Sequence, residues 1–231
     1  MSDHKELAAR RAVEYIQDGM VVGLGTGSTA EFAIRALGDR VQEEGLEIRC
    51  VPTSESSAAL GEQLGLDIQT LEDNPAIDLT IDGADEVDPD LELIKGLGGA
   101  LLREKIVAAA SSLEIIIVDP GKLVDRLGTR APLPVEVIPF AWGLAKLRLL
   151  DLCQRAELRL GDDGERFVTD NGNFILDCHF PNGIGDAGSL DRTIDEIPGV
   201  VENGLFVGLT DIVVVGLDDG QCRVMARSGS Q

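Results

Sequence analysis

The chain of 231 residues is long enough for one large domain or two smaller ones, and its hydrophobic content of 44% allows a buried core in either case. Its 41 acidic residues against 20 basic ones give a formal net charge of −21, which disfavours binding to nucleic acids and to anionic membranes. No apolar run reaches the 18 residues of a membrane-spanning helix, and the N-terminal stretch lacks a signal-peptide core. We therefore expect a cytoplasmic protein.

The types of basic and sulfur-containing residue add two expectations. Lysine is scarce, and an acid-rich, lysine-poor composition predicts adaptation to a salty cytoplasm, with an ordinary acidic protein as the alternative. The cysteines are widely scattered and form no Cys-x-x-Cys pair, which predicts free, buried thiols. Because the chain also has only two histidines, we predict no metal site. The four cysteines are Cys50, Cys153, Cys178 and Cys222.

Predicted strands and helices alternate along the first half of the chain. Helices are expected over 5–18 and 29–37, over a stretch that ends near Gly65, and over 100–112. Strands are expected over 20–24, 46–52, 67–71, 77–81 and 114–119. This order predicts an α/β fold with a doubly wound, mostly parallel, Rossmann-like sheet, whose functional loops gather at the carboxyl edge of the strands.

Prolines at 132, 134 and 139 mark a boundary, after which the order of elements changes. We expect strand 135–138, helix 141–155, strands 157–160 and 173–179, helix 189–196 and strand 200–206. This βαββαβ order predicts a smaller ferredoxin-like α+β domain for packing and assembly. Strands 211–217 and 221–225 are expected to return to the first sheet. The predicted domains are therefore 1–131 plus 207–231 and 132–206, with a frayed tail at 228–231.

A glycine-rich loop follows the first predicted strand and precedes a helix. Ser28 and Glu31 have the spacing of a capping box, so the loop and the helix N-terminus predict a phosphate cradle over 26–29. A dinucleotide fold begins in a similar way, but Ser28 stands where the last glycine of G-x-G-x-x-G belongs. Glu43 and Glu44 also lie in a helix-like stretch, where a ribose-binding acid should close a strand. NAD binding therefore fits less well. The hydroxyl residues at 53–57 either cap the next helix or line the same crevice.

The stretch 78–105 concentrates the groups that are most suited to chemistry. It carries Lys95, a glycine cluster and four acidic residues that could do chemistry, namely Asp82, Asp85, Glu86 and Glu104. On a helix Glu104 shares its face with Val107, Ala108 and Ser111, so we expect partial desolvation, which raises a carboxyl pKa toward the range of a general base. The alternative is a solvated helix glutamate.

Four motifs in consistent order resemble the ribose-5-phosphate isomerase type A family over about residues 5 to 218. They are GTGST at 25–29, DGADE at 82–86, KGLGGALLREK at 95–105 and PLPVEVIPFA at 132–141. The family's usual loop is Lys-Gly-Gly-Gly, and Leu97 interrupts it here. Because leucine takes a positive φ only at a cost, this departure bears on where the backbone donors of the loop point.

The resemblance implies reversible isomerisation of D-ribose 5-phosphate and D-ribulose 5-phosphate through an enediolate, in the non-oxidative pentose phosphate pathway, without a metal or cofactor. Glu104 would be the base and Lys95 would stabilise the charged oxygen. Asp82 and Asp85 would bind sugar hydroxyls and assist ring opening, and Lys122 would contact the substrate. The implied substrate-binding set is Thr26, Gly27, Ser28, Thr29, Asp82, Gly83, Ala84, Asp85, Lys95, Gly96, Leu97, Gly98 and Lys122. The partner is a small sugar phosphate, and enzymes that resemble this chain are commonly homodimers or homotetramers.

Two other functional classes remain open from the sequence. One is a sugar-phosphate sensor, which would need a DNA-binding segment that the chain does not show. The other is a related enzyme, either an amino-sugar-phosphate deaminase or a coenzyme A transferase. A transferase would use a glutamate as nucleophile, so a trapped thioester on Glu104 would distinguish it.

Overall fold

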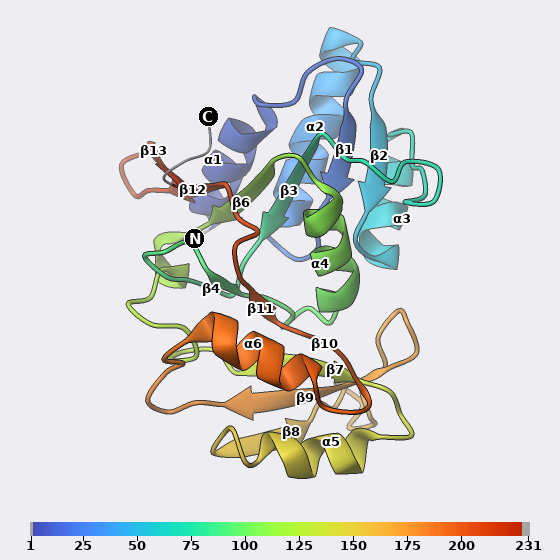
Figure 1. Ribbon diagram of the computed structural model, residues 1–231. Coiled ribbons are helices and arrows are strands. Elements are labelled where there is room, and N and C mark those ends of the chain that lie inside the picture. The colour runs from blue at the N-terminus through green and yellow to red at the C-terminus, as the bar shows by residue number, and fades with distance from the viewer. Residues whose placement is uncertain (1, 228–231) are drawn as a thin grey trace. The chain divides into compact units, whose positions relative to one another are not determined.

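The computed structural model describes residues 2–227, so the tail predicted at 228–231 lies outside the described residues (Figure 1). The chain folds into two compact units. The first comprises Met1–Ala84, Arg103–Lys122 and Leu209–Gln231, and the second comprises Asp85–Leu102 and Leu123–Gly208. Residues 85–102 and 123–131 therefore group with the second unit rather than the first, because short strands within 86–94 pair with residues 205–206 and Val124 N–H donates to Val87 O.

A six-stranded sheet forms the centre of the first unit. Its order is β13-β12-β6-β3-β1-β2, parallel throughout except for the β12–β13 hairpin at the edge. This confirms the predicted doubly wound sheet and the return of the C-terminal strands to it. The central strand β6 is buried at all five positions, as expected for a parallel strand covered on both faces. The strands are β1 (Val21–Leu24), β2 (Arg49–Pro52), β3 (Leu79–Gly83), β6 (Glu114–Val118), β12 (Ile212–Gly216) and β13 (Cys222–Ala226).

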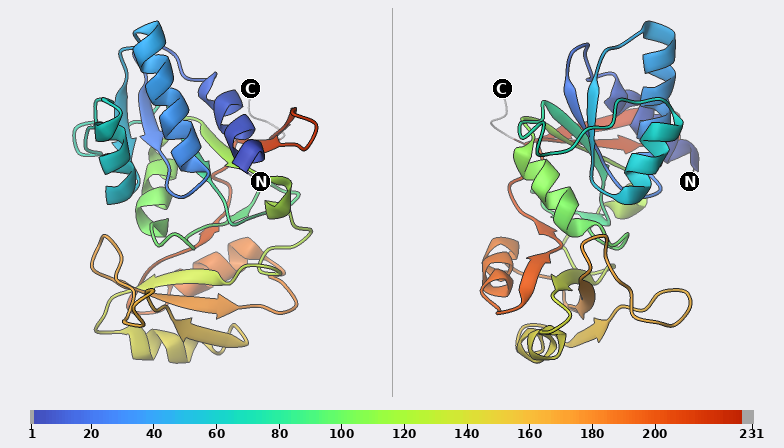
Figure 2. Two further views of the ribbon diagram at one scale, coloured as in Figure 1. Left: turned by 180° about the vertical axis from the view of Figure 1, so that it is seen from behind. Right: turned by 90° about the vertical axis from the view of Figure 1, so that its right-hand side faces the viewer.

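Helices cover both faces of this sheet (Figure 2). One apolar cluster joins helices α1 (Ser2–Val13) and α2 (Ala30–Glu44) to the central strands, and the edge helix α3 (Glu55–Gln63) packs beside α2. On the opposite face Val107 of α4 (Leu101–Ala110) packs with Val21, Val51 and Ile77. The sheet is thereby sandwiched, which leaves its carboxyl edge to the loops.

Two local predictions in this unit are wrong. Ser28 does not cap α2, because the helix begins after Thr29, which makes no side-chain capping bond. The segment 67–71 is not a strand, since it contributes only an isolated bridge between Cys50 and Ile68. In both places the tertiary contacts of the chain, and not the short sequence signal, decided the local structure.

The second unit contains an antiparallel sheet of order β10-β7-β9-β8. Its βαββαβ succession confirms the predicted ferredoxin-like fold. Val135, Val137 and Leu176 pack with Ala145 and Ile194 from the two helices. The elements are β7 (Leu133–Val137), α5 (Trp142–Leu149), β8 (Arg155–Leu158), β9 (Phe174–His179), α6 (Ala187–Asp195) and β10 (Val200–Asn203).

A three-stranded sheet in the same unit was not predicted. It has the order β11-β5-β4, formed by β4 (Glu86–Val87), β5 (Leu93–Ile94) and β11 (Leu205–Phe206). Strands of two residues carry too little periodicity to be recognised from sequence. Strand β4 directly follows Asp85 and strand β5 directly precedes Lys95, so this sheet anchors the backbone at both residues.

All four cysteines are free, and three of them are buried, whereas Cys222 is partly exposed. Burial raises the pKa of the Cys50 thiol to about 12, so this thiol stays protonated and inert at neutral pH. Within the described part of the chain, no helix combines the length and apolarity needed to cross a membrane.

Candidate active site

The glycine-rich loop at 25–29 leaves β1 beside the end of β3. Between these two strands the chain order of the parallel sheet reverses, and ligands of open α/β sheets bind at such a switch point. Gly25 N–H donates to Ile81 O (3.0 Å), and Thr26 N–H donates to Asp82 Oδ1 (3.0 Å). A Cβ on Gly25 would overlap the carboxylate and Cα of Asp82, so only glycine permits this approach.

Hydroxyl groups from the loop after β2 brace the glycine loop. Thr26 Oγ1 lies 2.7 Å from Thr53 Oγ1 and donates to Ser54 Oγ (2.8 Å). Ser57 Oγ donates to Gly25 O (2.6 Å), and Ser54 also caps α3 by accepting from Ser57 N–H. The predicted helix cap is therefore confirmed, and the hydroxyls also contact the glycine loop, whereas their place in a substrate crevice stays a prediction.

A lysine that the sequence did not single out also contacts the cradle. Lys5 of α1 donates from Nζ to Ser28 Oγ at 2.8 Å. This ammonium, together with the N-terminus of α2, offers positive charge to an anion at the loop. The sequence pointed to this lysine only through the scarcity of lysine in the chain. No local pattern connects two residues that lie 23 positions apart.

Glu104 lies in the first turn of α4 and is 5% exposed. Its helix-face neighbours Val107 and Ala108 are also buried, which confirms the expected apolar setting of this carboxylate. A buried glutamate is uncommon among helix glutamates, which are usually solvated. Burial of a carboxylate favours general-base chemistry.

Asp82 and Lys122 complete the predicted residues of the first unit. Asp82 lies in β3, one residue before the strand ends, and is 1% exposed, and its Oδ1 accepts from the N–H groups of Thr26 and Gly83. Lys122 closes a 3₁₀ turn (Pro120–Lys122) that follows β6, so it lies at the same carboxyl edge of the sheet. The cradle and Lys122 thus follow the ends of parallel strands, and Asp82 and Gly83 are the last two residues of β3.

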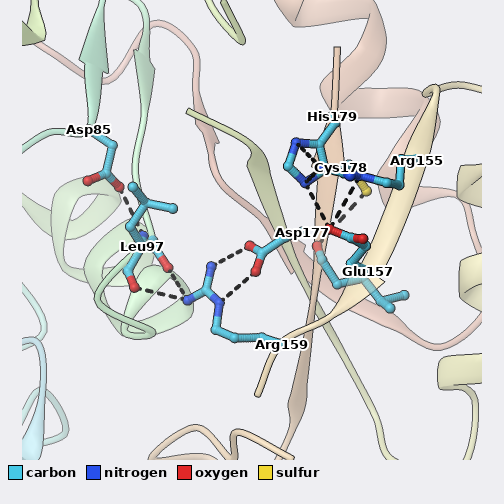
Figure 3. Close-up of polar contacts among 10 residues, drawn as sticks. Asp85, Leu97, Arg155, Glu157, Arg159, Asp177, Cys178 and His179 are labelled. Atoms are coloured by element: carbon cyan, nitrogen blue, oxygen red, sulfur yellow. Dashed lines mark hydrogen bonds and ion pairs between the residues drawn. The ribbon is translucent and has the colours of Figure 1, made fainter. Parts of the chain in front are cut away.

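The second unit carries the remaining predicted residues, which are Asp85 before β4 and the loop Lys95–Gly98 after β5. Lys95 follows β5 and is 2% exposed, with Nζ 5.4 Å from the centroid of the Phe206 ring. Gly96 and Gly99 adopt positive φ values of 104° and 85°, and Gly99 N–H donates to Gly96 O (3.0 Å), which closes a tight turn. Asp85 Oδ2 accepts from Leu97 N–H at 2.9 Å (Figure 3).

Leu97 fits this turn without backbone strain. The only non-glycine residue with a positive φ among those described is Leu91, so Leu97 keeps an ordinary backbone conformation. Its side chain is 42% exposed. The two positions with left-handed backbone, 96 and 99, are both glycine, so leucine at 97 does not disturb the turn.

Glu86, the remaining acidic candidate of the 78–105 stretch, accepts hydrogen bonds from backbone N–H groups. It is fully buried, and its Oε2 accepts from Gly128 N–H (2.5 Å). Its Oε1 accepts from the N–H groups of Arg130 (2.6 Å) and Ala131 (2.7 Å). We assign it to the framework of the second unit, since a carboxylate engaged by three amides is fixed in place.

One group of carboxylates in the second unit has a spacing that suits a cation. Asp191, Asp195 and Glu202 bring one oxygen each within 4.8 Å of one another. Asn203 Nδ2 donates to Asp191 Oδ1 (2.8 Å) and to Asp195 Oδ1 (2.9 Å), which gives these carboxylates a protein donor. The group is remote in sequence from every motif described above.

The structure thus brings the predicted residues together in two sets. One set, in the first unit, contains the cradle, Asp82, Gly83, Glu104 and Lys122, with Ala84 at its boundary. The other, in the second unit, contains Asp85 and the Lys95–Gly98 loop. Their individual roles remain predictions.

Comparison with known proteins identifies the family of this chain. The model of ribose 5-phosphate isomerase A (phosphoriboisomerase A) matches residues 49–220. The ribose-5-phosphate isomerase A of Gloeobacter violaceus is 53% identical over 227 residues, covering 98% of this chain and 97% of that protein. The enzyme of Ruegeria pomeroyi is 52% identical, covering 95% and 86%.

Solved structures agree with the sequence comparison. Ribose 5-phosphate isomerase from Plasmodium falciparum superposes with a TM-score of 0.95 at 37% identity, covering 99% of this chain and all of that one. A D-ribose-5-phosphate isomerase in complex with phospho-erythronic acid gives a TM-score of 0.92 at 43% identity, covering 96% and 97%. With these matches over nearly its whole length, the chain belongs to the ribose 5-phosphate isomerase A family.

Proposed function

We propose that this protein interconverts D-ribose 5-phosphate and D-ribulose 5-phosphate, with Glu104 as the general base. The observation that carries the proposal is the buried Glu104 carboxylate, held in the same unit as a phosphate cradle at the switch point of the sheet. Membership of the isomerase family supports the substrate and the reaction. The step belongs to the non-oxidative pentose phosphate pathway.

The proposed reaction moves two protons. Glu104 removes the proton from C2 of the open-chain aldose, a C1=C2 double bond forms, and the former carbonyl oxygen on C1 takes up the negative charge. Lys95 and N–H groups of its loop stabilise this enediolate, because fixed donors are most effective where charge develops. The proton then returns from Glu104 to C1, O1 is protonated, and the O2 hydroxyl gives up its proton to become the new carbonyl.

In this proposal the remaining residues bind the substrate and assist the opening of its ring. Thr26–Thr29 and Lys5 hold the phosphate, and Lys122 contacts the substrate. Asp82 and Asp85 each orient one backbone segment through one carboxylate oxygen, as described above, and we propose that they also accept sugar hydroxyls during ring opening. Asp82 and Asp85 are three residues apart, so chain connectivity keeps their Cα atoms within about 11 Å.

An absorbance assay of ketose formation from ribose 5-phosphate, without added metal or nucleotide, tests the function. The wild-type chain should turn over, and Lys5→Met should raise both the KM and the inhibition constant of inorganic phosphate. No ketose formation by the folded wild-type protein would refute the proposal. Ammonia release from an amino-sugar phosphate would favour the deaminase, and a thioester trapped on Glu104 would favour the transferase.

We also propose that the acidic surface is an adaptation to salt. At a net charge of −21 the folded chain repels itself, and molar salt shortens the reach of that repulsion to about 3 Å. We expect the melting temperature to rise between low and molar KCl. A flat or falling melting temperature would contradict this. The free cysteines support a reducing, cytoplasmic location, which cell fractionation would test.

We further propose a homodimer or homotetramer that uses the outer face of α5. Phe140 is 97% exposed, and Leu144 and Leu147 follow it at helical spacing, with Ile138 and Leu150 also exposed. An apolar patch of this kind typically marks an interface. Light scattering should give the mass of two or four chains, and Leu147→Asp should shift it toward one. A wild-type mass of a single chain would disprove the proposal.

A further inference from the structure

An arginine in the second unit donates hydrogen bonds to the loop that carries Lys95. Arg159 comes directly after β8, and its Nη1 donates to Gly96 O (2.9 Å) and to Leu97 O (3.1 Å). Its Nε donates to Asp177 Oδ2 (2.9 Å) and its Nη2 to Asp177 Oδ1 (Figure 3). The Arg159 side chain is 12% exposed and that of Asp177 17%, so this ion pair is largely shielded from solvent.

Each of these contacts fixes a different degree of freedom. The two bonds to Asp177 of β9 lock the plane of the guanidinium, because Arg and a carboxylate match as a rigid fork. The remaining edge of that plane then accommodates two successive carbonyl groups of the loop. Phe167 covers the group, with its ring centroid 5.8 Å from the Arg159 Cζ. A Cβ on Gly99 would overlap the same ring, so the turn packs directly beneath Phe167.

Holding a carbonyl also aims the next amide, because a trans peptide is planar and its N–H points opposite to its C=O. The Gly96 carbonyl faces Arg159, and the N–H of the same peptide, on Leu97, points away to Asp85 Oδ2. The Leu97 carbonyl also faces Arg159, so the N–H of Gly98 must be directed away from the guanidinium. Gly98 is exposed, which is compatible with a ligand reaching its N–H.

We propose that the Arg159–Asp177 pair is a positioning element that aims the Gly98 amide at the substrate's reacting oxygen. The proposal rests on the isomerase function given above, in which the Lys95–Gly98 loop stabilises the enediolate. Arg159 does not itself contact substrate and acts only through the two carbonyl groups. This arrangement also accounts for the presence of Leu97 in the loop, since the turn is oriented through its backbone and not through its side chains.

The test compares Arg159→Met with Arg155→Met as a matched control. Arg155 belongs to the same hairpin, but it is 58% exposed and pairs with Glu157, away from the loop. We expect Arg159→Met to lower kcat/KM by about 10- to 100-fold, mainly through kcat, because small misplacements of catalytic groups have effects of that size. Arg155→Met should leave both constants unchanged. Asp177→Asn, which keeps Arg159 but frees its plane, should show the same pattern to a smaller degree.

Two inhibitors separate positioning from general damage. Inorganic phosphate probes the cradle, so its inhibition constant should not change in the Arg159 variant. Phospho-erythronic acid, which a related isomerase binds, carries a carboxylate in place of the reacting carbon, so its inhibition constant should rise about tenfold or more. Unchanged inhibition by this acid, or equal weakening of both inhibitors, in folded Arg159→Met and Asp177→Asn would overturn the proposal. An inactive wild-type chain would instead refute the isomerase function itself.

Discussion

Replacing Glu104 with Gln is expected to lower kcat by about 10²–10⁴-fold, the usual contribution of a positioned general base. Glutamine preserves the volume of the side chain and its position in the first turn of α4, where Val107 and Ala108 are its buried neighbours. It cannot accept the C2 proton, because an amide oxygen is too weak a base. The KM should change much less than kcat, since in the proposed mechanism the cradle, and not the base, provides ground-state binding.

Two further variants define what this result means. Glu104→Asp keeps the carboxylate but withdraws it by about one methylene, so its activity should fall between wild type and Glu104→Gln. Glu62→Gln changes an exposed helix glutamate of the same unit and should leave kcat unaltered. If folded Glu104→Gln retained near-normal turnover, the base would have to be assigned elsewhere.

Replacing Glu86 with Gln is expected to destabilise the second unit without removing a catalytic group. The Glu86 carboxylate accepts three backbone N–H groups, two on Oε1 and one on Oε2. A glutamine in the same position would turn its NH₂ toward one of these donors, which leaves a buried amide without an acceptor. Such a loss costs about 1–3 kcal/mol in the free energy of unfolding.

Thermal unfolding measures this effect. For a chain of this size each kcal/mol corresponds to about 2–4 °C, so the melting temperature of Glu86→Gln should fall by roughly 2–12 °C. Glu92→Gln provides the control, because the bond that Glu92 accepts from Gly208 N–H is exposed and an amide oxygen can also accept it. A melting temperature within about one degree of wild type for Glu86→Gln would mean that the buried carboxylate does not hold its loop.

The contrast between Glu86 and Glu104 shows that residue type alone identifies candidate residues but does not distinguish their roles. Both lie in one acidic stretch, and the sequence offers both as candidates for chemistry. The distinction follows from their partners, since three amides from a loop more than forty residues away surround Glu86. Sequence periodicity identified the buried face of α4 around Glu104, but it contains no information about which distant amides approach Glu86.

The sequence by itself determined the alternation of strands and helices, the ferredoxin-like order after Pro132, the glycine loop after β1 and the family. Those features depend on hydrophobic periodicity, turn chemistry and motif order, which are local properties of the chain. Only the tertiary structure decided that Lys5 meets Ser28, that Glu86 is a framework residue and that Arg159 donates to the carbonyl groups of the Lys95 loop, across 63 residues in the case of Gly96. The physical reason is that a hydrogen bond between distant residues forms only after packing has closed the chain between them, and nothing in the local pattern specifies that closure.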